Sequence, residues 1–422
     1  MNDRLQESTI DREFPDNRAF LREPRRAEPR LEVALVTGSG TDSFLPAPDL
    51  ADDLQRLGQR VQLIRPRRHK WEQPGSTDRF KEVLLPRHPS PARLIHHWRL
   101  HTPDIVHILD SGYLGWVATH TARQLGIPVS VACHGPLRQA WEPGYEQRPW
   151  QQRFVQGWKR HICRSAHALI AANHEDIAAL RRQGLHHTRQ AARGIDLAHW
   201  HPSQRSLSLR HQWGIRADTP VLAHWGPVDD VLTINSLRNA MAALLERHPQ
   251  ARLLLINGGR IPTRLQALRP LRSEDWRDNP LGRRNHDRQC PLATLLASAD
   301  ILLVPRPESC PELIPHALAS GLALIARRTE LTRIHIEDGH NGLLVAAAED
   351  DSSQYPALFA DALRQLTSHA TTLPRLRLRA PTSVAHLERR QAADQLVRVF
   401  KEVIQGHARC QRAANTLVIA TD

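Results

Sequence analysis

Short runs of apolar residues, separated by amphipathic stretches, recur along most of the chain. The first unit reads as an apolar strand at 31–37, a glycine turn, a helix that stops at Gly58 and a second strand at 61–64. Short, continuous apolar strands suit parallel sheets that are covered on both faces. Further strands are predicted at 104–109, 129–132, 168–172, 221–225, 252–256, 301–304 and 322–326.

Helices are predicted between these strands, where apolar residues recur with helical spacing. Their ranges are 50–57, 114–125, 150–164, 175–182, 236–247, 292–298 and 313–319, with a final helix at 384–405. The pattern changes between Pro202 and Pro220 and then restarts. The sequence therefore predicts an α/β protein with two Rossmann-like halves in series, each built on a parallel sheet.

Composition fits this prediction and excludes some classes of protein. The 422 residues are 41% hydrophobic and 24% charged, which is ordinary for globular domains and excludes a fully disordered chain. Residues 1–30 carry seven arginines and seven acidic residues among few apolar ones, so we expect this segment to be disordered. No apolar run is long enough to span a bilayer, and the polar beginning predicts no signal peptide. Five scattered cysteines predict reduced thiols and a cytoplasmic location.

The net charge of +13 raises the question of an anionic partner. Eight arginines lie between Arg260 and Arg288. Such a surface suits a phosphate-bearing ligand, an anionic lipid surface or a nucleic acid, and it equally suits a solvated face. A nucleic-acid binder would rest on the net charge alone, so we expect no nucleic-acid partner.

Several common motifs are incomplete in this chain. Gly38-Ser39-Gly40 follows a strand as a dinucleotide fingerprint would, but Ser43 stands where the third glycine belongs. The turn can still cradle a phosphate with its backbone amides. The sequence contains no P-loop pattern, and Ala178 stands where a zinc-protease helix beginning at His174 needs its second histidine. We therefore expect no metal site.

A set of segments, weak one by one, is specific in its order and spacing between Val33 and Val345. Together they resemble the retaining, nucleotide-sugar-dependent glycosyltransferases of family 4, also called group 1, which have the GT-B fold. The segments and the family patterns that they resemble are 103–110 ("PDVVHxHD"), 126–135 ("GIPVVxTxHG"), 193–202 ("NGVDxxxFxP"), 299–305 ("ADVFVxPS"), 308–321 ("ExFGxxxxEAMASG") and 338–345 ("DGxNGLLV").

The resemblance implies two Rossmann-like domains that face each other across a cleft. Residues 31–202 would form the acceptor-side domain, 203–382 the nucleotide-sugar domain, and 383–422 a helix that crosses back, with a tail. The implied activity is transfer of a hexose from a UDP- or GDP-sugar to a saccharide or lipid-linked acceptor with retention, without a metal or other cofactor. A role in polysaccharide assembly follows from the family.

The resemblance also implies the site residues. Glu308 and His134 are the predicted catalytic residues, at the donor sugar. The resemblance places Asp110 on the acceptor side. Its position after a strand is one where open α/β sheets bind ligands. The donor would be bound by residues of the glycine turns, the nucleobase-side loop and the signature segment: Gly38, Gly40, Gly226, Gly282, Arg283, Arg306, Glu312 and His316.

The donor site departs from the family pattern at four positions. His316 replaces the glutamate that holds the ribose, and Pro311 lacks the N–H that a backbone contact to the sugar needs. Pro227 and Leu232 stand where the family has the arginine and lysine that neutralise the donor diphosphate. Arg306, Arg260 or the pair Arg327 and Arg328 are candidates to replace these cations. The alternative is a GT-B protein without activity that binds a saccharide or a partner glycosyltransferase.

The predicted helix at 150–164 leaves one further alternative open. Trp150, Phe154, Trp158 and Ile162 recur every four residues, with basic residues between them. Such a helix can lie on an anionic membrane, which would place the protein at the inner face of the membrane. Packing of the apolar face on the protein's own sheet is the favoured interpretation.

Overall fold

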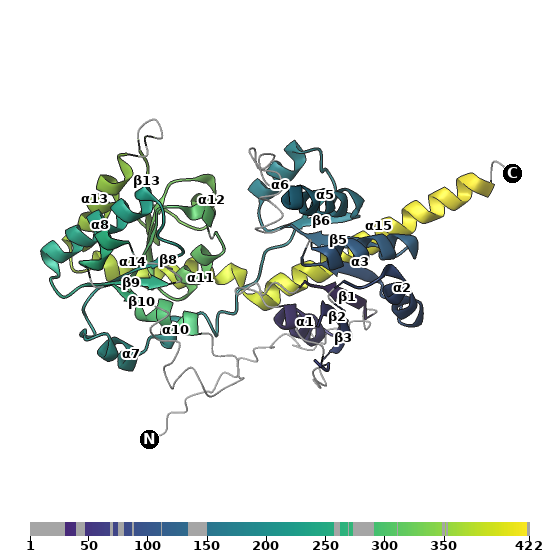
Figure 1. Ribbon diagram of the computed structural model, residues 1–422, viewed down its shortest axis with the longest axis horizontal. Coiled ribbons are helices and arrows are strands. Elements are labelled where there is room, and N and C mark those ends of the chain that lie inside the picture. The colour runs from purple at the N-terminus through teal and green to yellow at the C-terminus, as the bar shows by residue number, and fades with distance from the viewer. Residues whose placement is uncertain are drawn as a thin grey trace, which may run out of the picture.

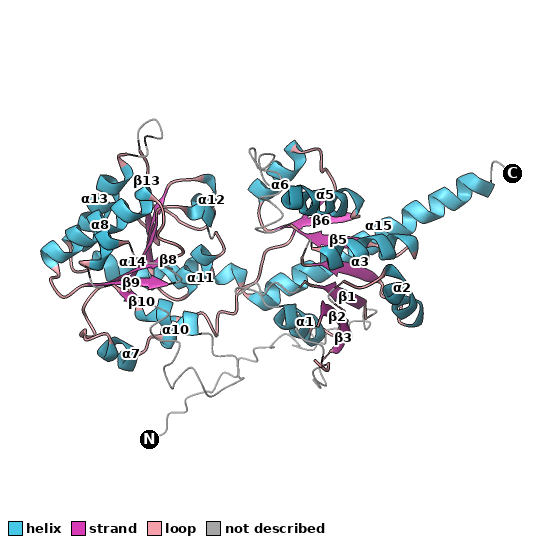
Figure 2. Ribbon diagram, in the orientation of Figure 1, coloured by secondary structure: helices cyan, strands magenta, loops and turns pink. Residues whose placement is uncertain are grey.

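The fold consists of two lobes, each built around a parallel β-sheet (Figures 1 and 2). The computed structural model describes residues 30–38, 47–67, 71–74, 80–86, 88–110, 112–133, 150–256, 262–268, 270–272, 291–309, 311–347, 351 and 353–419. The segment predicted to be disordered therefore lies outside the described residues, apart from Arg30.

The first sheet is entirely parallel among its described strands and has the order β3-β2-β1-β4-β5-β6-β7. The strands are β1 (Glu32–Val36), β2 (Arg60–Pro66), β3 (Lys81–Leu85), β4 (Ile105–Ile108), β5 (Val129–Ala132), β6 (Ala168–Ala171) and β7 (Thr188–Gln190). The helices of this lobe are α1 (Ala47–Arg56), α2 (Pro91–Leu100), α3 (Tyr113–Gln124), α5 (Trp150–Ser165) and α6 (His174–Arg182).

The second sheet is also parallel, with the order β10-β9-β8-β11-β12-β13. Its strands are β8 (Val221–Trp225), β9 (Arg252–Ile256), β10 (Leu271–Arg272), β11 (Ile301–Val304), β12 (Ala323–Arg327) and β13 (Gly342–Val345). The helices are α7 (Leu207–Gln212), α8 (Val231–Arg247), α9 (Thr263–Gln266), α10 (Pro291–Ser298), α11 (Leu313–Ala319), α12 (Glu330–Arg333), α13 (Tyr355–Ser368) and α14 (Thr372–Ser383). Short 3₁₀ turns lie at Pro202–Gln204, Pro307–Ser309 and Ala385–Leu387.

The central strands form where the sequence predicts them, because their apolar runs are buried on both faces. Strands β5, β8, β9 and β11 have the predicted bounds. All four residues of β4, β5 and β11 are buried. Each sheet carries one apolar cluster on each face, which is the arrangement expected of parallel sheets that are covered by helices.

Helix α8 begins five residues before the predicted start. Asp230 is its N-cap and accepts a hydrogen bond from the backbone N–H of Thr233 at 2.9 Å. An aspartate in this position satisfies one of the amide groups that the first helical turn leaves without a helical partner. The sequence analysis assigned Leu232 to the family's diphosphate loop, and so it missed the capped first turn.

The last helix, α15 (Arg389–Ile419), starts beside the second lobe and runs along the first (Figure 1). Its apolar side chains, Phe400 among them, pack against β1 and α1. The predicted range, 384–405, is wrong at both ends. Residues 385–387 form a 3₁₀ turn, and Glu388 pairs with Ile195 of the linker between the lobes (residues 191–206, between β7 and α7). The helix therefore cannot begin earlier.

The linker between the lobes explains why Gly194 occupies its position. A Cβ atom there would lie 2.5 Å from the Cα of Arg389. The neighbouring Ile195 exchanges backbone hydrogen bonds with Leu387 and Arg389. The Arg389 guanidinium binds Asp53 of α1 at 2.6 and 2.7 Å and Asp196 of the linker at 2.8 Å. These contacts tie the linker and the start of α15 to the first lobe.

Candidate active site

Gly38 and Asp110 lie together at the carboxyl edge of the first sheet. Gly38 follows β1 and Asp110 follows β4, its neighbour in the sheet. A Cβ atom at Gly38 would overlap Oδ2 of Asp110 and lie 2.9 Å from its Cγ. The other carboxylate oxygen, Oδ1, accepts the backbone N–H of Gly112 at 3.1 Å. The structure thus places side by side two residues that the sequence analysis assigned to different ligands.

A lysine from α5 shares the surroundings of this carboxylate. Burial lowers the pKa of Lys159, and the negative charge of Asp110 opposes the shift. Aromatic residues lie close to both in the sequence: the ring of Tyr113, at the start of α3, lies 5.7 Å from that of Trp158 and 5.9 Å from that of Trp116. Ile162 is fully buried in the core of the lobe. This part of α5 therefore packs on its own lobe, as favoured, whereas the side chains of Trp150 and Phe154 lie outside the described set.

Four predicted site residues lie outside the described residues. They are His134, Gly40, Gly282 and Arg283. Their roles stay predictions.

Four charged side chains lie at three neighbouring strand ends of the second sheet, and we call them the charge row: Asp230, Arg306, Glu308 and Arg327. Asp230 ends the loop after β8, Arg306 and Glu308 follow β11, and Arg327 is the last residue of β12. Arg306 and Asp230 are 3.5 Å apart, and Arg327 binds Glu308. Acid and base thus alternate along the carboxyl edge, where open α/β sheets bind their ligands.

The two arginines of the charge row differ in exposure and in their contacts. The Arg306 side chain is 50% exposed, whereas that of Arg327 is 25% exposed and its guanidinium lies 5.8 Å from the centre of the Tyr355 ring. Partial burial acts to raise the pKa of Asp230, but hydrogen bonds from Thr233 and the charge of Arg306 hold it below its ordinary value. Asp230 is therefore an anion at neutral pH.

The loop after β8 contains the predicted glycine turn and none of the cations of the family pattern. Gly226 has a φ of +108°, a conformation that favours glycine, and its N–H bonds to the carbonyl of Ile256 at 2.9 Å. Pro227 and Asp229 are exposed, while Leu232 packs against the apolar cluster under α8. Between 226 and 232 the loop therefore offers a diphosphate no positive side chain.

Glu312 and His316 both face protein groups. The Glu312 carboxylate lies 3.3 Å from the Arg193 guanidinium of the linker. His316 is 3% exposed, its ring lies edge-on to Trp200 with 4.8 Å between the centroids, and its Nδ1 lies 2.6 Å from the carbonyl oxygen of Glu312. A carbonyl only accepts, so Nδ1 carries the proton. Contact of either residue with a nucleotide stays a prediction.

Sequence reasoning missed the partners of these residues. Arg193 and Glu312 are 119 residues apart, and Arg327 and Glu308 are 19 apart. The motif at 193–202 was recognised as a segment that resembles the family, but it did not indicate that Arg193 and Trp200 lie near the signature segment. Asp230 carried a usable signal, since an aspartate before a helical stretch is a frequent N-cap.

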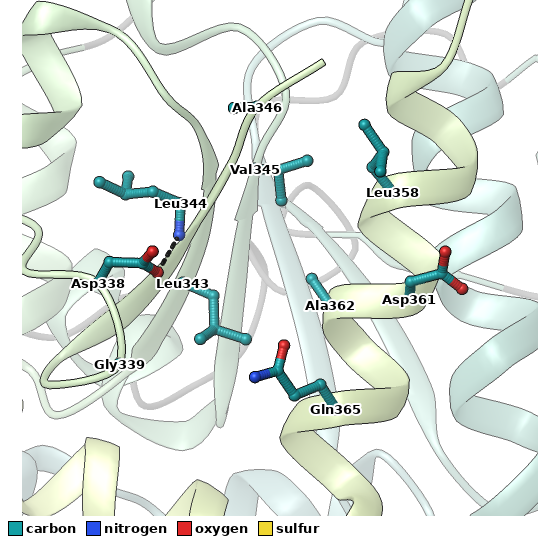
Figure 3. A pocket seen from close by; sticks show the side chains of 10 residues that line it. All are labelled: Asp338, Gly339, Leu343, Leu344, Val345, Ala346, Leu358, Asp361, Ala362 and Gln365. Atoms are coloured by element: carbon teal, nitrogen blue, oxygen red, sulfur yellow. Dashed lines mark hydrogen bonds between the residues drawn. The ribbon is translucent and has the colours of Figure 1, made fainter. Parts of the chain in front are cut away.

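A pocket of about 440 Å³ lies elsewhere, between β13 and α13 (Figure 3). Leu343, Val345 and Leu358 give it apolar walls, and the Asp338 carboxylate at its rim accepts the N–H of Leu344 at 2.9 Å. None of the predicted site residues lines this pocket. It is therefore distinct from the charge row.

Two kinds of feature are absent from the described residues. No helix within the described ranges combines the length and the apolar character that a membrane span needs. In the same part of the chain, no three histidine, cysteine, aspartate or glutamate side chains are grouped so that they could hold a metal ion. Independence from metal stays a prediction.

Comparison with known proteins places both lobes in one family. A family model described as "Glycosyl transferase 4-like domain" matches residues 27–194, and one described as "Glycosyl transferases group 1" matches residues 219–369. A GDP-mannose-dependent alpha-mannosyltransferase from Mycobacterium tuberculosis is 28% identical over 64% of this chain and 67% of its own length. One from Mycolicibacterium smegmatis is 25% identical over 75% of this chain and 84% of its own length.

Solved structures show the same fold. Sucrose-phosphate synthase from Thermosynechococcus elongatus superposes with a TM-score of 0.63 at 18% identity, over 89% of this chain and all of that one. HepE from Anabaena, solved in complex with UDP-glucose, gives a TM-score of 0.61 at 15% identity, over 88% of this chain and all of that one. The predicted fold class is thereby confirmed, and the chain belongs to the glycosyltransferases of family 4, also called group 1, with the GT-B fold.

Proposed function

We propose that the chain transfers a hexose from a UDP- or GDP-sugar to a saccharide or lipid-linked acceptor, with retention, and that GDP-mannose is the first donor to test. The observation that carries the proposal is the position of Glu308 and two guanidiniums at the carboxyl edge of the second sheet. The names of the mycobacterial relatives support GDP-mannose.

In the proposed reaction the bond between the anomeric carbon and the donor diphosphate breaks while a bond to the acceptor oxygen forms on the same face. The acceptor hydroxyl proton passes to the departing diphosphate. Glu308 accepts hydrogen bonds from the sugar hydroxyls, and positive side chains stabilise the charge that develops on the leaving group. The acceptor approaches from the side of Asp110, with His134 beside the sugar.

No metal or other cofactor takes part in the proposed reaction, because guanidinium groups can neutralise a diphosphate. The proposal predicts that a chelator such as EDTA leaves transfer unchanged. Peripheral contact with an anionic membrane, a location at its inner face, and a lipid-linked acceptor belong to the same proposal. Vesicles with and without anionic lipid test that contact by sedimentation.

A second candidate is a family member without activity that binds a saccharide or a partner glycosyltransferase. Two observations favour it: Pro227 and Leu232 leave the loop after β8 without cations, and Asp229 and Asp230 add negative charge there. The two candidates differ in whether the protein consumes a nucleotide sugar.

The first test is the melting temperature of the purified protein with millimolar GDP, UDP and ADP, at matched ionic strength. A ligand at 100 times its Kd stabilises the fold by about 2.7 kcal/mol, which is an easily measured shift. A shift with one nucleoside diphosphate supports the proposal and identifies the base. No shift with any of the three, together with no consumption of GDP-mannose, would favour the second candidate.

A further inference from the structure

Both arginines of the charge row are held by acids that solvent reaches. The Arg306 and Asp230 side chains are 50% and 26% exposed and 3.5 Å apart. The Glu308 side chain, which binds Arg327, is 46% exposed. Ion pairs in contact with water contribute little, because the charges interact in a high dielectric and compete with hydration. Neither guanidinium is therefore committed to its present partner.

The two arginines are positioned so that both guanidiniums could bind one diphosphate. Strand β11 lies between β8 and β12, so Arg306 and Arg327 extend from neighbouring strand ends, on either side of Glu308 in the charge row. A guanidinium binds phosphate with two parallel N–H···O bonds, whereas a lysine acts as a point charge. A nucleoside diphosphate also carries more negative charge than a single carboxylate. It should therefore displace Asp230 and Glu308 from their arginines.

We propose that Arg306 and Arg327 form the diphosphate clamp of this chain, in place of the cations that the loop after β8 lacks. Asp230 and Glu308 hold the two guanidiniums until a nucleoside diphosphate exchanges with them. The inference rests on the proposed function, since it concerns the same donor site. It relocates the positive charge from the loop after β8 to the ends of β11 and β12.

The exchange has a consequence for Glu308. Oε1 of its carboxylate is bound to Arg327, which takes up part of the capacity of this group to accept hydrogen bonds from a sugar. Transfer of Arg327 to the diphosphate releases Glu308 at the moment when the sugar arrives. Arg327 is thus a positioning residue as well as a phosphate ligand, and the Tyr355 ring beneath it keeps the guanidinium near the strand end.

The clamp is tested by calorimetric titration of the full-length protein with GDP and GMP, or with UDP and UMP if the donor base is uracil. We expect Arg306→Ala and Arg327→Ala each to weaken binding of the diphosphate about tenfold or more, and binding of the monophosphate less. Arg364→Ala is the matched control, because Arg364 of α13 is about as exposed as Arg306 and pairs with a carboxylate, that of Glu246 in α8, at 3.1 Å. It should bind both nucleotides as the wild type does.

Asp230→Asn separates the clamp from a merely structural role. Asparagine caps a helix as well as aspartate does, so α8 stays capped while the negative charge is removed. Without its competitor, Arg306 should bind the diphosphate about two- to fivefold more tightly. A variant that fails to fold cannot gain affinity, so this result supports the clamp independently of the alanine variants.

These measurements can refute the clamp without refuting the donor site. If the wild type binds GDP or UDP and the Arg306 and Arg327 variants bind it like the Arg364 variant, the clamp is refuted and the donor site stands. Unchanged or weaker binding in Asp230→Asn refutes the exchange with Asp230. If the wild type binds neither nucleoside diphosphate, the proposed function fails and the clamp fails with it.

Discussion

Replacing Asp300 by asparagine should destabilise the second lobe strongly, because one carboxylate there holds three guanidiniums. The Asp300 side chain is 5% exposed and precedes β11. Its Oδ1 lies 2.6 Å from Arg377 and 3.0 Å from Arg205, and its Oδ2 lies 3.2 Å from Arg210. Oδ2 also accepts the N–H of Val221 at 2.9 Å. Asparagine keeps the shape and one acceptor but removes the negative charge that all three guanidiniums contact.

The magnitude follows from the burial of Arg210, whose side chain is 1% exposed. Burial lowers the pKa of Arg210, and the charge of Asp300 is the largest influence that opposes this shift. Removal of one partner from a buried ion pair costs about 3–5 kcal/mol, since it leaves the other charge without compensation. Whole proteins are stable by roughly 5–15 kcal/mol. The Asp300→Asn variant should therefore lose a large part of its stability.

Differential scanning calorimetry measures the loss. For a domain of this size, 1 kcal/mol shifts the Tm by about 2–4 °C, so we expect a fall of roughly 6–20 °C. Glu246→Gln is the control, since its pair with Arg364 is exposed to solvent and contributes little to stability. If Asp300→Asn melts within a degree or two of that control, the reasoning from buried charge is wrong.

Two further predictions concern the first lobe and the pH. Gly38→Ala should reduce transfer about 100-fold, because its methyl group displaces the Asp110 carboxylate by about 1 Å. Gly157→Ala is the control: this position is helical and exposed, with open space around it, so transfer should be unchanged and the Tm should rise. Equal transfer rates in the two variants would count against the site. Burial lowers the pKa of His107 to about 3 and that of His335 to about 4. Below about pH 6.5 both histidines therefore bind a proton in the unfolded chain but not in the folded protein. The unfolding free energy should therefore be constant above about pH 7 and fall by about 1.4 kcal/mol per histidine between pH 7.5 and 5.5 in denaturant titrations, and His107→Asn should remove one histidine's share of that fall.

The sequence predicts most of the fold because the strands that matter are short, apolar and buried on both faces. It fails at the edges of the sheets, where β3, β7, β10 and β13 are not recognised as strands. Residues such as Lys81 and Glu82 of β3 or Arg189 of β7 face partly toward solvent, so these two segments lack a continuous apolar run. Strand β13 has an apolar run, but the sequence analysis assigned it only to a family motif. The start of α15 is missed for a different reason, since it depends on the pairing of Ile195 with Glu388, far away in the sequence.

In the candidate site too, local features were predictable from the sequence and long-range contacts were not. Strand ends are local features, so the sequence could place Gly38, Asp110 and Glu308 at the carboxyl edges of the two sheets. Which charges meet there is set by neighbouring strands and loops, and no local pattern reveals that Arg327 binds Glu308 or that Arg193 meets Glu312. His316 shows the same limit, because its burial against Trp200 depends on the linker.

The central claim is that the carboxyl edge of the second sheet binds and consumes a nucleotide sugar. The most direct measurement is release of nucleoside diphosphate from GDP-mannose, and from UDP-glucose in parallel, with a saccharide acceptor mixture and with the Glu308→Gln protein as the paired sample. Release from one donor by the wild type, reduced about 100-fold or more in Glu308→Gln while that variant still binds the nucleotide, is the result that the account predicts. Equal release from the wild type and Glu308→Gln, or none from either donor by a protein that binds neither nucleotide, would contradict it.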